Sequence, residues 1–361
     1  MKEDEFFIKK VLKLAKKGLN FTFPNPLVGA IIVKNGKIIS QAFHKKYGSL
    51  HAEVLALKKA KENAKGATLY TNLEPCCHFG KTPPCTQAIL KAKIKRVVFS
   101  TLDPNPQVNG KGLEILKKAK IETKVGVLEK QAKLLNEAFF TFHQKKRPFV
   151  CVKFAASLDG KIATRNFQSK WITGEKARNY ARKLRLWYQA ILVGANTVIK
   201  DNPHLGVRQK NKKDPLRIIL DDKLKVPFNL QVFRDKNLLL VTTKFAKKEK
   251  LKKLEKMKIP FIVYNQKRIS ISKLLEDLKN KNIISVLVEG GGETIGSFFD
   301  EGVVDKIYAF YSPLIIGGKK AVCAVLGKGV ENLSCAFSLS QIKFKRFDND
   351  FLISGYINTK N

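Results

Sequence analysis

Apolar positions along the chain switch repeatedly between a helical and an extended period. Residues 3–17 carry Phe7, Val11, Leu14 and Ala15 at helical spacing, which predicts an opening amphipathic helix. Helices are also expected over 52–60, 86–91, 112–118, 174–188 and 272–279. Short apolar runs between turn signals predict strands over 30–33, 38–39, 68–73, 96–100, 121–127, 149–154, 190–194, 216–221, 238–242, 261–264 and 284–289. Strands that alternate with helices predict an α/β fold.

A charged run that ends in proline, residues 144–148, interrupts both periods. The chain has 361 residues, which is long enough for two domains with full cores. The sequence therefore predicts an α/β domain over 1–145 and a second one over 146–361.

The formal net charge of +39 raises the question of nucleic-acid binding. The excess is mostly lysine in scattered pairs such as Lys9-Lys10 and Lys117-Lys118, without interleaved aromatic residues. A nucleic-acid footprint should cluster, so we expect no nucleic-acid partner. A diffuse positive field would instead attract small phosphorylated substrates.

The six cysteines form no regular disulfide pattern, which suits a reducing compartment. The first residues are acidic, and no apolar signal segment follows them. No apolar run approaches the ~18 residues of a membrane span. We therefore expect a cytoplasmic protein without a membrane partner.

Candidate chemistry concentrates between His51-Ala52-Glu53 and a segment that runs from Pro75 to Cys85. One imidazole and two thiolates, from His51, Cys76 and Cys85, are expected to bind one zinc ion. Three protein ligands leave the fourth position for a water whose pKa falls to about 7. Because two thiolates cancel the charge of the metal, the proton of that water needs a nearby base, and Glu53 is the candidate. The pattern is the signature of zinc-dependent deaminases.

A structural zinc site is the alternative, with Cys77 or His78 as a fourth ligand. Adjacent cysteines rarely both reach one metal, and a structural site has no use for Glu53, so the catalytic interpretation is favoured. One geometric difficulty concerns His51 and Glu53, because residues i and i+2 do not share a helix face. Both can face one metal only at the irregular first turn of the helix expected over 52–60.

Cys85 lies nine positions after Cys76, and the intervening segment resembles the insertion of the riboflavin-pathway pyrimidine deaminases, in which the position of Cys77 is not a ligand. Segments 25–29 and 103–112 strengthen the resemblance to the deaminase half of the bifunctional riboflavin biosynthesis proteins of bacteria. It implies a cytidine-deaminase-like three-layer domain and a phosphoribosylated diaminopyrimidinone as substrate. Asn25 and His44 are then candidate substrate contacts. A turn former and a surface histidine are their alternative roles.

In the second half, the strand expected up to Val288 runs into Glu289, three glycines and a helix. Exposed backbone N–H groups at a helix N-terminus form a phosphate cradle. A simple tight turn is the alternative, since the pattern is not the dinucleotide fingerprint G-x-G-x-x-G.

Six segments resemble the reductase half of the same proteins, whose fold is similar to dihydrofolate reductase; they span 157–161, 169–173, 193–198, 201–203, 207–208 and 288–291. The resemblance implies NADPH as cofactor. Its NADP contacts fall on Ala155, Trp171, Thr197, Asp201, Gly291, Gly292, Glu293, Thr294, Ile295, Gly296 and Ser297. Its substrate contacts fall on Ser169, Arg185, Leu205, Arg208 and Glu289.

Arg185 and Arg208 can grip a phosphate through bidentate guanidinium contacts. Lys153 is a candidate proton donor, although a lysine leaving a strand is often merely solvated. The chain departs from the usual family pattern at 166–168, at Asn202 and at Gly206, which bears on fine substrate contacts.

The sequence thus predicts a bifunctional enzyme of riboflavin biosynthesis. Zinc-dependent hydrolytic deamination of 2,5-diamino-6-(5-phosphoribosylamino)pyrimidin-4-one precedes NADPH-dependent reduction of 5-amino-6-(5-phosphoribosylamino)uracil to its ribityl form. The resemblance also implies a homo-oligomer. Two rivals remain at this stage. An RNA nucleobase deaminase would leave the second domain unexplained, and a non-enzymatic zinc module that binds nucleic acid would leave Glu53 and the Glu289 loop unexplained.

Overall fold

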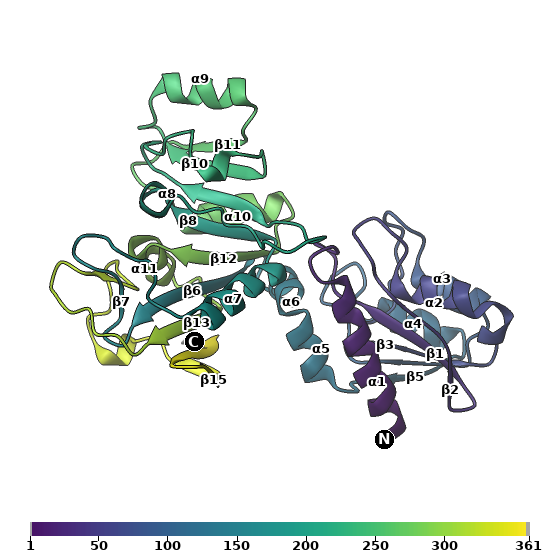
Figure 1. Ribbon diagram of the computed structural model, residues 1–361. Coiled ribbons are helices and arrows are strands. Elements are labelled where there is room, and N and C mark those ends of the chain that lie inside the picture. Colours follow the sequence, from purple (N-terminus) through teal and green to yellow (C-terminus); the bar gives the residue numbers. More distant parts are fainter. Residues whose placement is uncertain (1, 359–361) are drawn as a thin grey trace. The chain divides into compact units, whose positions relative to one another are not determined.

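The computed structural model describes residues 2–358. Their contacts divide the chain into two compact units, with the division between Arg147 and Pro148 (Figure 1). This division falls inside the charged run from which the domain boundary was predicted. The first residue and the last three residues of the two expected domains lie outside the described residues.

The first unit is built on a five-stranded sheet in the order β2-β1-β3-β4-β5. β1 is antiparallel to β2 and β3, whereas β3, β4 and β5 are parallel. The strands are β1 (Gly29–Lys34), β2 (Lys37–Phe43), β3 (Thr68–Thr71), β4 (Arg96–Phe99) and β5 (Glu122–Val125). The helices are α1 (Lys2–Ala15), α2 (Ala52–Ala60), α3 (Cys85–Lys91), α4 (Lys111–Lys118), α5 (Glu129–Leu135) and α6 (Glu137–Gln144).

The helical period of the opening segment buries one face of α1 against this sheet. Phe7, Ile8 and Val11 pack with Ile31 and Tyr70, which β1 and β3 present on the same face. α2 packs on β1 and β2 and also contacts α3. The carboxyl end of β3 and the amino ends of α2 and α3 thereby frame one region of the unit, to which the candidate metal ligands belong.

The second unit holds a nine-stranded sheet in the order β11-β10-β9-β8-β12-β6-β13-β16-β15. All pairings from β11 to β13 are parallel, and the last two are antiparallel. A small antiparallel pair, β14 with β7, lies beside it. The strands are β6 (Phe149–Ser157), β7 (Lys161–Ala163), β8 (Ala190–Gly194), β9 (Leu216–Leu220), β10 (Leu238–Thr243), β11 (Phe261–Tyr264), β12 (Ser285–Gly290), β13 (Lys306–Ser312), β14 (Val322–Cys323), β15 (Leu339–Phe347) and β16 (Asp350–Ile357). The helices are α7 (Glu175–Leu184), α8 (Ala195–Asp201), α9 (Lys248–Met257), α10 (Ile271–Asn280) and α11 (Gly292–Asp300).

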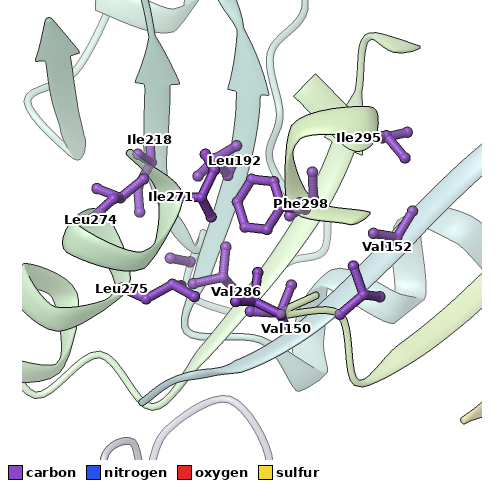
Figure 2. Close-up of a cluster of buried hydrophobic side chains, with 14 of the residues drawn as sticks. Val150, Val152, Leu192, Ile218, Ile271, Leu274, Leu275, Val286, Ile295 and Phe298 are labelled. Carbon is purple, nitrogen blue, oxygen red and sulfur yellow. The ribbon is translucent and has the colours of Figure 1, made fainter. Parts of the chain in front are cut away.

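The main core of this unit lies between the central strands and the helices α10 and α11. Figure 2 shows Phe298 of α11 beside Leu192 of β8, with Val286 of β12 and Leu275 of α10 nearby. Helices cover both faces of the central strands, so β12 is buried along nearly its whole length. This explains why its sequence is a continuous apolar run and not an alternating one.

The expected alternation of strands and helices is confirmed in both units. The expected helix over 52–60 coincides with α2, and the one over 174–188 ends earlier, at Leu184, before a short 3₁₀ helix over Arg185–Trp187. None of the helices within residues 2–358 is long and apolar enough to cross a membrane.

Candidate active sites

Three segments bring the predicted metal ligands together in the first unit. Cys76 follows the end of β3, Cys85 is the first residue of α3, and His51 is the residue that precedes α2. His51 Nδ1 lies 3.3 Å from Cys85 Sγ and 3.4 Å from Cys76 Sγ. Within residues 2–358 these three side chains form a group whose ligand atoms all lie within 4.8 Å of one another.

The position of His51 resolves the difficulty that its spacing from Glu53 raised. His51 has extended backbone angles, φ −70° and ψ 160°, and caps α2 from outside the helix. Its side chain therefore does not follow the helical period, while Glu53 sits in the first turn. The side chains of His51 and Glu53 can therefore face the same metal position, because only Glu53 is part of the helix.

The separations of the ligand atoms fit a tetrahedral zinc ion. Zinc bonds of about 2.0–2.3 Å predict nitrogen–sulfur distances of roughly 3.5 Å in that geometry, close to those observed. Contacts with Cys85 and His51 lower the pKa of Cys76 to about 4, and contact with Cys76 raises that of His51. Together the three residues match the ligand set of a catalytic zinc.

Glu53 lies beside this group and is 4% exposed. Its Oε2 atom is buried without a hydrogen-bond partner among the described residues. Burial raises the pKa of this carboxyl to about 7. A buried carboxyl with one unpartnered oxygen next to a metal site is suited to carry a proton near neutral pH.

The neighbours Cys77 and His78 do not join the ligand group. The Cys77 thiol donates to the carbonyl of Gln107 at 3.6 Å. The segment 77–84 forms a loop between the two cysteine ligands. Two hydrogen bonds join the ends of this loop, because the Thr86 N–H donates to the Cys76 carbonyl at 3.1 Å and the Cys85 N–H donates to Cys76 Sγ at 3.4 Å.

A cavity of about 270 Å³ opens onto His51, Glu53 and Cys76. Asn25 and His44 line it, as the resemblance implied. His44 Nδ1 lies 3.3 Å from the Leu50 carbonyl, which can only accept, so Nδ1 carries the proton and Nε2 accepts from the Asn25 amide at 3.1 Å. Burial lowers the pKa of His44. The amide oxygen of Asn25 is thereby left for another partner.

Several further residues line this cavity without having been predicted as site residues; they are Tyr47, His78, Lys81, Thr82, Asp103 and Asn105. They come from three segments far apart in the sequence, of which the segment between Cys76 and Cys85 carried the family resemblance and Tyr47 has no local pattern that marks it. Asp103 and Asn105 lie inside the segment 103–112 on which the family resemblance rested, and that resemblance was the available signal.

Glu74 fixes the segment that carries Asp103. Its carboxylate accepts from the N–H groups of Asp103 at 3.1 Å, Gly110 at 2.9 Å and Leu113 at 3.0 Å. A side chain at Gly112 would meet the Pro75 carbonyl oxygen at 2.2 Å, so the chain packs here without space for one. Glu74 precedes Pro75 and Cys76, and it therefore ties one cavity wall to the strand that delivers a metal ligand.

A larger cavity, of about 810 Å³, lies in the second unit. Most residues that the resemblance assigned to NADP or substrate line it. They are Ala155, Ser169, Trp171, Arg185, Thr197, Asp201, Leu205, Arg208, Glu289, Gly291 and Ile295. Lys153, the candidate proton donor, also lines the cavity. Ser169 donates to Asp201 at 3.0 Å, so residues assigned to the two different ligands are in direct contact.

Five other assigned residues do not line this cavity within the described chain; they are Gly292, Glu293, Thr294, Gly296 and Ser297. A Cβ atom at Gly292 would meet the Cys323 carbonyl oxygen at 2.4 Å, and one at Gly296 would meet that of Leu326 at 1.9 Å. These glycines let α11 pack against segment 323–327. Gly290, with φ +125°, is the position where the turn itself requires glycine.

Glu289 is the centre of a buried charge cluster in this cavity. Arg185 donates to both its carboxylate oxygens, at 2.7 and 2.9 Å, and Lys153 Nζ lies 3.1 Å from Oε2. The remaining guanidinium nitrogen of Arg185, Nη1, donates to the Gly206 carbonyl at 2.7 Å. Burial alone would raise the pKa of Glu289, but the two cations outweigh it and hold it at about 2.

Arg185 and Arg208 therefore differ in what they can offer a ligand. Arg185 faces the cavity with its guanidinium already paired, whereas Arg208 is exposed at the cavity lining. Asn202, one of the departures from the family pattern, uses its amide oxygen to accept from the Gln231 N–H at 2.8 Å. That departure thus has a structural use at the cavity wall.

Comparisons with known proteins agree with this geometry. The family model described as "RibD C-terminal domain" matches residues 148–353, and that described as "Cytidine and deoxycytidylate deaminase zinc-binding region" matches residues 1–101. The chain is 44% identical over 351 residues to riboflavin biosynthesis protein RibD of Aquifex aeolicus, covering 97% of each chain.

Solved structures give the same result for the whole chain. The Acinetobacter baumannii RibD structure superposes with a TM-score of 0.90 at 34% identity. A Thermotoga maritima diaminohydroxyphosphoribosylaminopyrimidine deaminase/5-amino-6-(5-phosphoribosylamino)uracil reductase superposes with a TM-score of 0.85 at 38% identity. Each comparison covers 99% of both chains. The expected fold, a cytidine-deaminase-like unit followed by a reductase unit, is confirmed.

Proposed function

The chain belongs to the RibD family of bifunctional riboflavin biosynthesis enzymes, and we propose that its two cavities divide the two reactions between them. The enzyme is a zinc-dependent deaminase and an NADP-dependent reductase. In this proposal residues 1–145 deaminate and residues 146–361 reduce. The observation that carries it is the group of His51, Cys76 and Cys85 beside a buried, unpartnered Glu53 oxygen.

In the first cavity, His51, Cys76 and Cys85 would hold zinc, which when bound supplies an acidified water as nucleophile. Glu53, whose pKa is raised to about 7 by burial, would hold the proton that the nucleophile gives up and deliver it to the leaving amino nitrogen. The Asn25 amide, oriented by neutral His44, orients the pyrimidine ring.

Lys81 is our proposed phosphate contact in this cavity. Among the described lining residues it is the one lysine or arginine. It belongs to the segment 77–84, and its Nζ lies over the Tyr47 ring at 4.1 Å from the centroid. A lysine there can meet the phosphate of a substrate whose ring faces His51 and Glu53.

In the second cavity, bound NADPH supplies a hydride. Ala155, Trp171, Thr197, Asp201, Gly291 and Ile295, which line the cavity, would bind it. Ser169, Leu205 and Glu289 would contact the substrate, and the exposed guanidinium of Arg208 would contact its phosphate. Lys153, whose Nζ lies 3.1 Å from Glu289 Oε2, would donate the proton that accompanies reduction. Arg185 serves this site mainly by fixing Glu289.

The substrates in this proposal are small phosphorylated pyrimidines, and nucleic acid and membranes have no part in it. We also propose a cytoplasmic homo-oligomer. β15 is an edge strand of the large sheet with Ile342 49% and Phe344 74% exposed. An exposed apolar edge strand is a template for pairing with a second copy. An RNA nucleobase deaminase is not favoured, because the second unit and its cavity would have no use.

Ultraviolet absorbance of the purified enzyme tests the division of labour. Mixed with the diaminopyrimidinone phosphate, the zinc-loaded enzyme should deaminate it without NADPH, and consumption of NADPH should follow when the cofactor is added. Zinc-stripped enzyme given the already deaminated intermediate should still oxidise NADPH. Loss of that second reaction on zinc removal, with the protein still folded by circular dichroism, would overturn the assignment.

A further inference from the structure

The segment 202–208 holds the substrate side of the reductase cavity in an unusual backbone conformation. Asn202, Leu205 and Arg208 have positive φ angles of 42°, 59° and 55°. This left-handed region costs a residue other than glycine roughly 1–2 kcal/mol. Such a conformation persists only where the surroundings hold it, and two of these residues are proposed substrate contacts.

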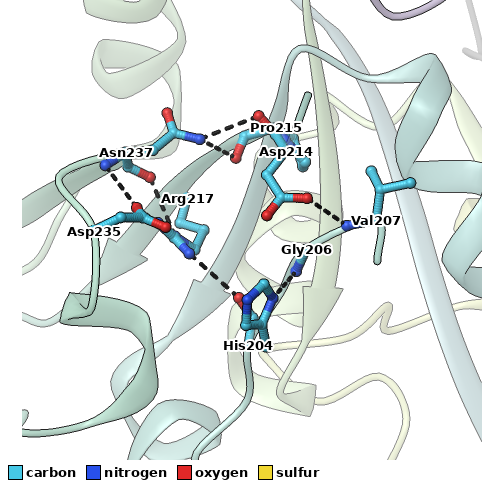
Figure 3. Close-up of polar contacts among 8 residues, drawn as sticks. All are labelled: His204, Gly206, Val207, Asp214, Pro215, Arg217, Asp235 and Asn237. Carbon is cyan, nitrogen blue, oxygen red and sulfur yellow. Dashed lines mark hydrogen bonds and ion pairs between the residues drawn. The ribbon is translucent and has the colours of Figure 1, made fainter. Parts of the chain in front are cut away.

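Several hydrogen bonds hold this segment, and Figure 3 shows those that His204 and Asp214 accept. The Val207 N–H donates to Asp214 Oδ1 at 2.7 Å, and the Gly206 N–H donates to His204 Nδ1 at 3.1 Å. From the other side, Arg185 donates to the Gly206 carbonyl at 2.7 Å. Leu205 and Val207 are buried anchors, 4% and 2% exposed, so the contact with Asp214 fixes the residue directly before Arg208.

Asp214 is itself held at the start of β9. The Asn237 amide donates to the carbonyls of Asp214 at 3.1 Å and Pro215 at 3.0 Å (Figure 3). A Cβ atom at Gly206 would lie 2.5 Å from Asp214 Oδ2 and 2.5 Å from His204 Nδ1. The absence of a side chain at Gly206 thus makes room for the two groups that hold the segment, which explains this departure from the family pattern.

We propose that Asp214 is a positioning residue for the reduction. Asp214 is not among the described residues that line the cavity, so it acts through its bond to Val207, which keeps Arg208 in the conformation that presents the guanidinium to the cavity. The inference rests on the proposed function, in which Arg208 contacts the substrate phosphate. It adds a residue that neither the motif pattern nor the cavity lining identifies.

A double-mutant cycle tests this role with the full-length enzyme and NADPH. Asp214→Ala should raise the reductase KM for the aminouracil phosphate about tenfold, with kcat and the Kd for NADPH nearly unchanged. Asp214→Asn retains an oxygen acceptor for the Val207 N–H and should restore the KM to within about twofold. Because Asp214 acts through Arg208, the double variant with Arg208→Ala should have the KM of Arg208→Ala alone.

Two further variants separate positioning from general damage. Gly206→Ala places a methyl group against Asp214 and His204 and should raise the KM in the same way, which keeps the test available if Asp214→Ala fails to fold. Asp221→Ala is the matched control, since it removes a similar bond from the Val226 N–H to Asp221 Oδ2 at 2.8 Å. It should lower the melting temperature and leave the KM unchanged.

The outcomes are distinguishable. If Arg208→Ala raises the KM but Asp214→Ala and Gly206→Ala do not, the positioning role is wrong and the phosphate assignment stands. Additive effects in the double variant, or equal effects of Asp214→Asn and Asp214→Ala, also overturn the role. If Arg208→Ala leaves the KM unchanged, the proposed phosphate contact fails and the inference fails with it.

Discussion

Glu53 in the first unit and Glu289 in the second both line a cavity with little of the side chain exposed, 4% of the residue for Glu53 and 6% of the side chain for Glu289, yet their surroundings are opposite. Glu53 has an oxygen without a hydrogen-bond partner within residues 2–358 and a pKa raised to about 7. Glu289 pairs with Arg185 and Lys153 and has a pKa of about 2. Burial raises the pKa of each, so the neighbouring charges decide the outcome.

The difference determines what each carboxyl can do at neutral pH. A group with a pKa near 7 can gain and lose a proton during a reaction, which is the work of a general acid and base. A group with a pKa near 2 stays anionic and serves as a counter-ion that holds cations in place. We therefore expect substitutions of Glu53 to affect rate and substitutions of Glu289 to affect stability.

The largest expected effect is that of Glu53→Gln on deamination. Glutamine keeps the shape of the side chain but cannot carry the proton, so kcat of the deaminase should fall by about 10²–10⁴-fold. Zinc content, measured by atomic absorption, should stay near one per chain, and reductase activity should be unchanged. Near-normal deaminase turnover would contradict the role of Glu53.

Glu289→Gln should lower the stability of the second unit. Removing one partner of a buried ion pair leaves Arg185 and Lys153 without their counter-ion, which typically costs about 3–5 kcal/mol. Both tryptophans of the chain, Trp171 and Trp187, lie in the second unit, so tryptophan fluorescence during urea unfolding reports on that unit. A variant as stable as the wild type would show that the pairing contributes little, and Glu53→Gln is the control that should not lower this stability.

At low pH, the wild type and Glu289→Gln should have nearly the same free energy of unfolding. The pKa of Glu289 falls from 4.5 to about 2 on folding. Its contribution, on the order of 3 kcal/mol, is therefore present above about pH 4.5 and is lost as the pH falls toward 2. The stability gap between the two proteins should narrow over this window. A gap that is constant from pH 6 to pH 2.5 would contradict the depressed pKa.

The smallest effect is expected for Cys77→Ser. The Cys77 thiol contacts the Gln107 carbonyl and lies outside the ligand group, so the variant should retain about one zinc per chain and most deaminase activity. Cys85→Ser should lose the metal and serves as the positive control. Zinc loss from Cys77→Ser would mean that the three-ligand assignment is incomplete.

Local patterns carried much of the prediction for the first unit. The ligand spacing and the helix over 52–60 are properties of short stretches of sequence, and the structure brings His51, Cys76 and Cys85 together as expected. His51 lies at the N-cap position, outside the helix, so the i, i+2 spacing of His51 and Glu53 does not keep them from facing one metal. Cavity residues such as Asp103 could not be placed without the family resemblance, because their approach depends on tertiary bonds such as those made by Glu74.

The sequence patterns predict no strand after residue 290, although this part of the chain holds β13, β14, β15 and β16. β15 is largely exposed, so its sequence lacks the buried apolar run that marked β12. Asp214 was missed for a different reason. Its effect depends on one hydrogen bond across seven residues to Val207, and a lone aspartate before proline carries no signal of such a contact.

The hydrogen bonds that join the two ends of segment 77–84 allow the length and sequence of this loop to vary. The backbone N–H groups of Thr86 and Cys85 donate hydrogen bonds to Cys76, and these bonds hold the two cysteine ligands together without any contribution from the residues between them. The short zinc-deaminase motif has two residues between its cysteines. By loop-closure entropy, the eight residues between Cys76 and Cys85 cost only about 1.2 kcal/mol more. A change in the length or sequence of segment 77–84, which contains Lys81, therefore leaves the metal site intact. Such a change alters the cavity lining and with it the substrate that the same deamination chemistry accepts.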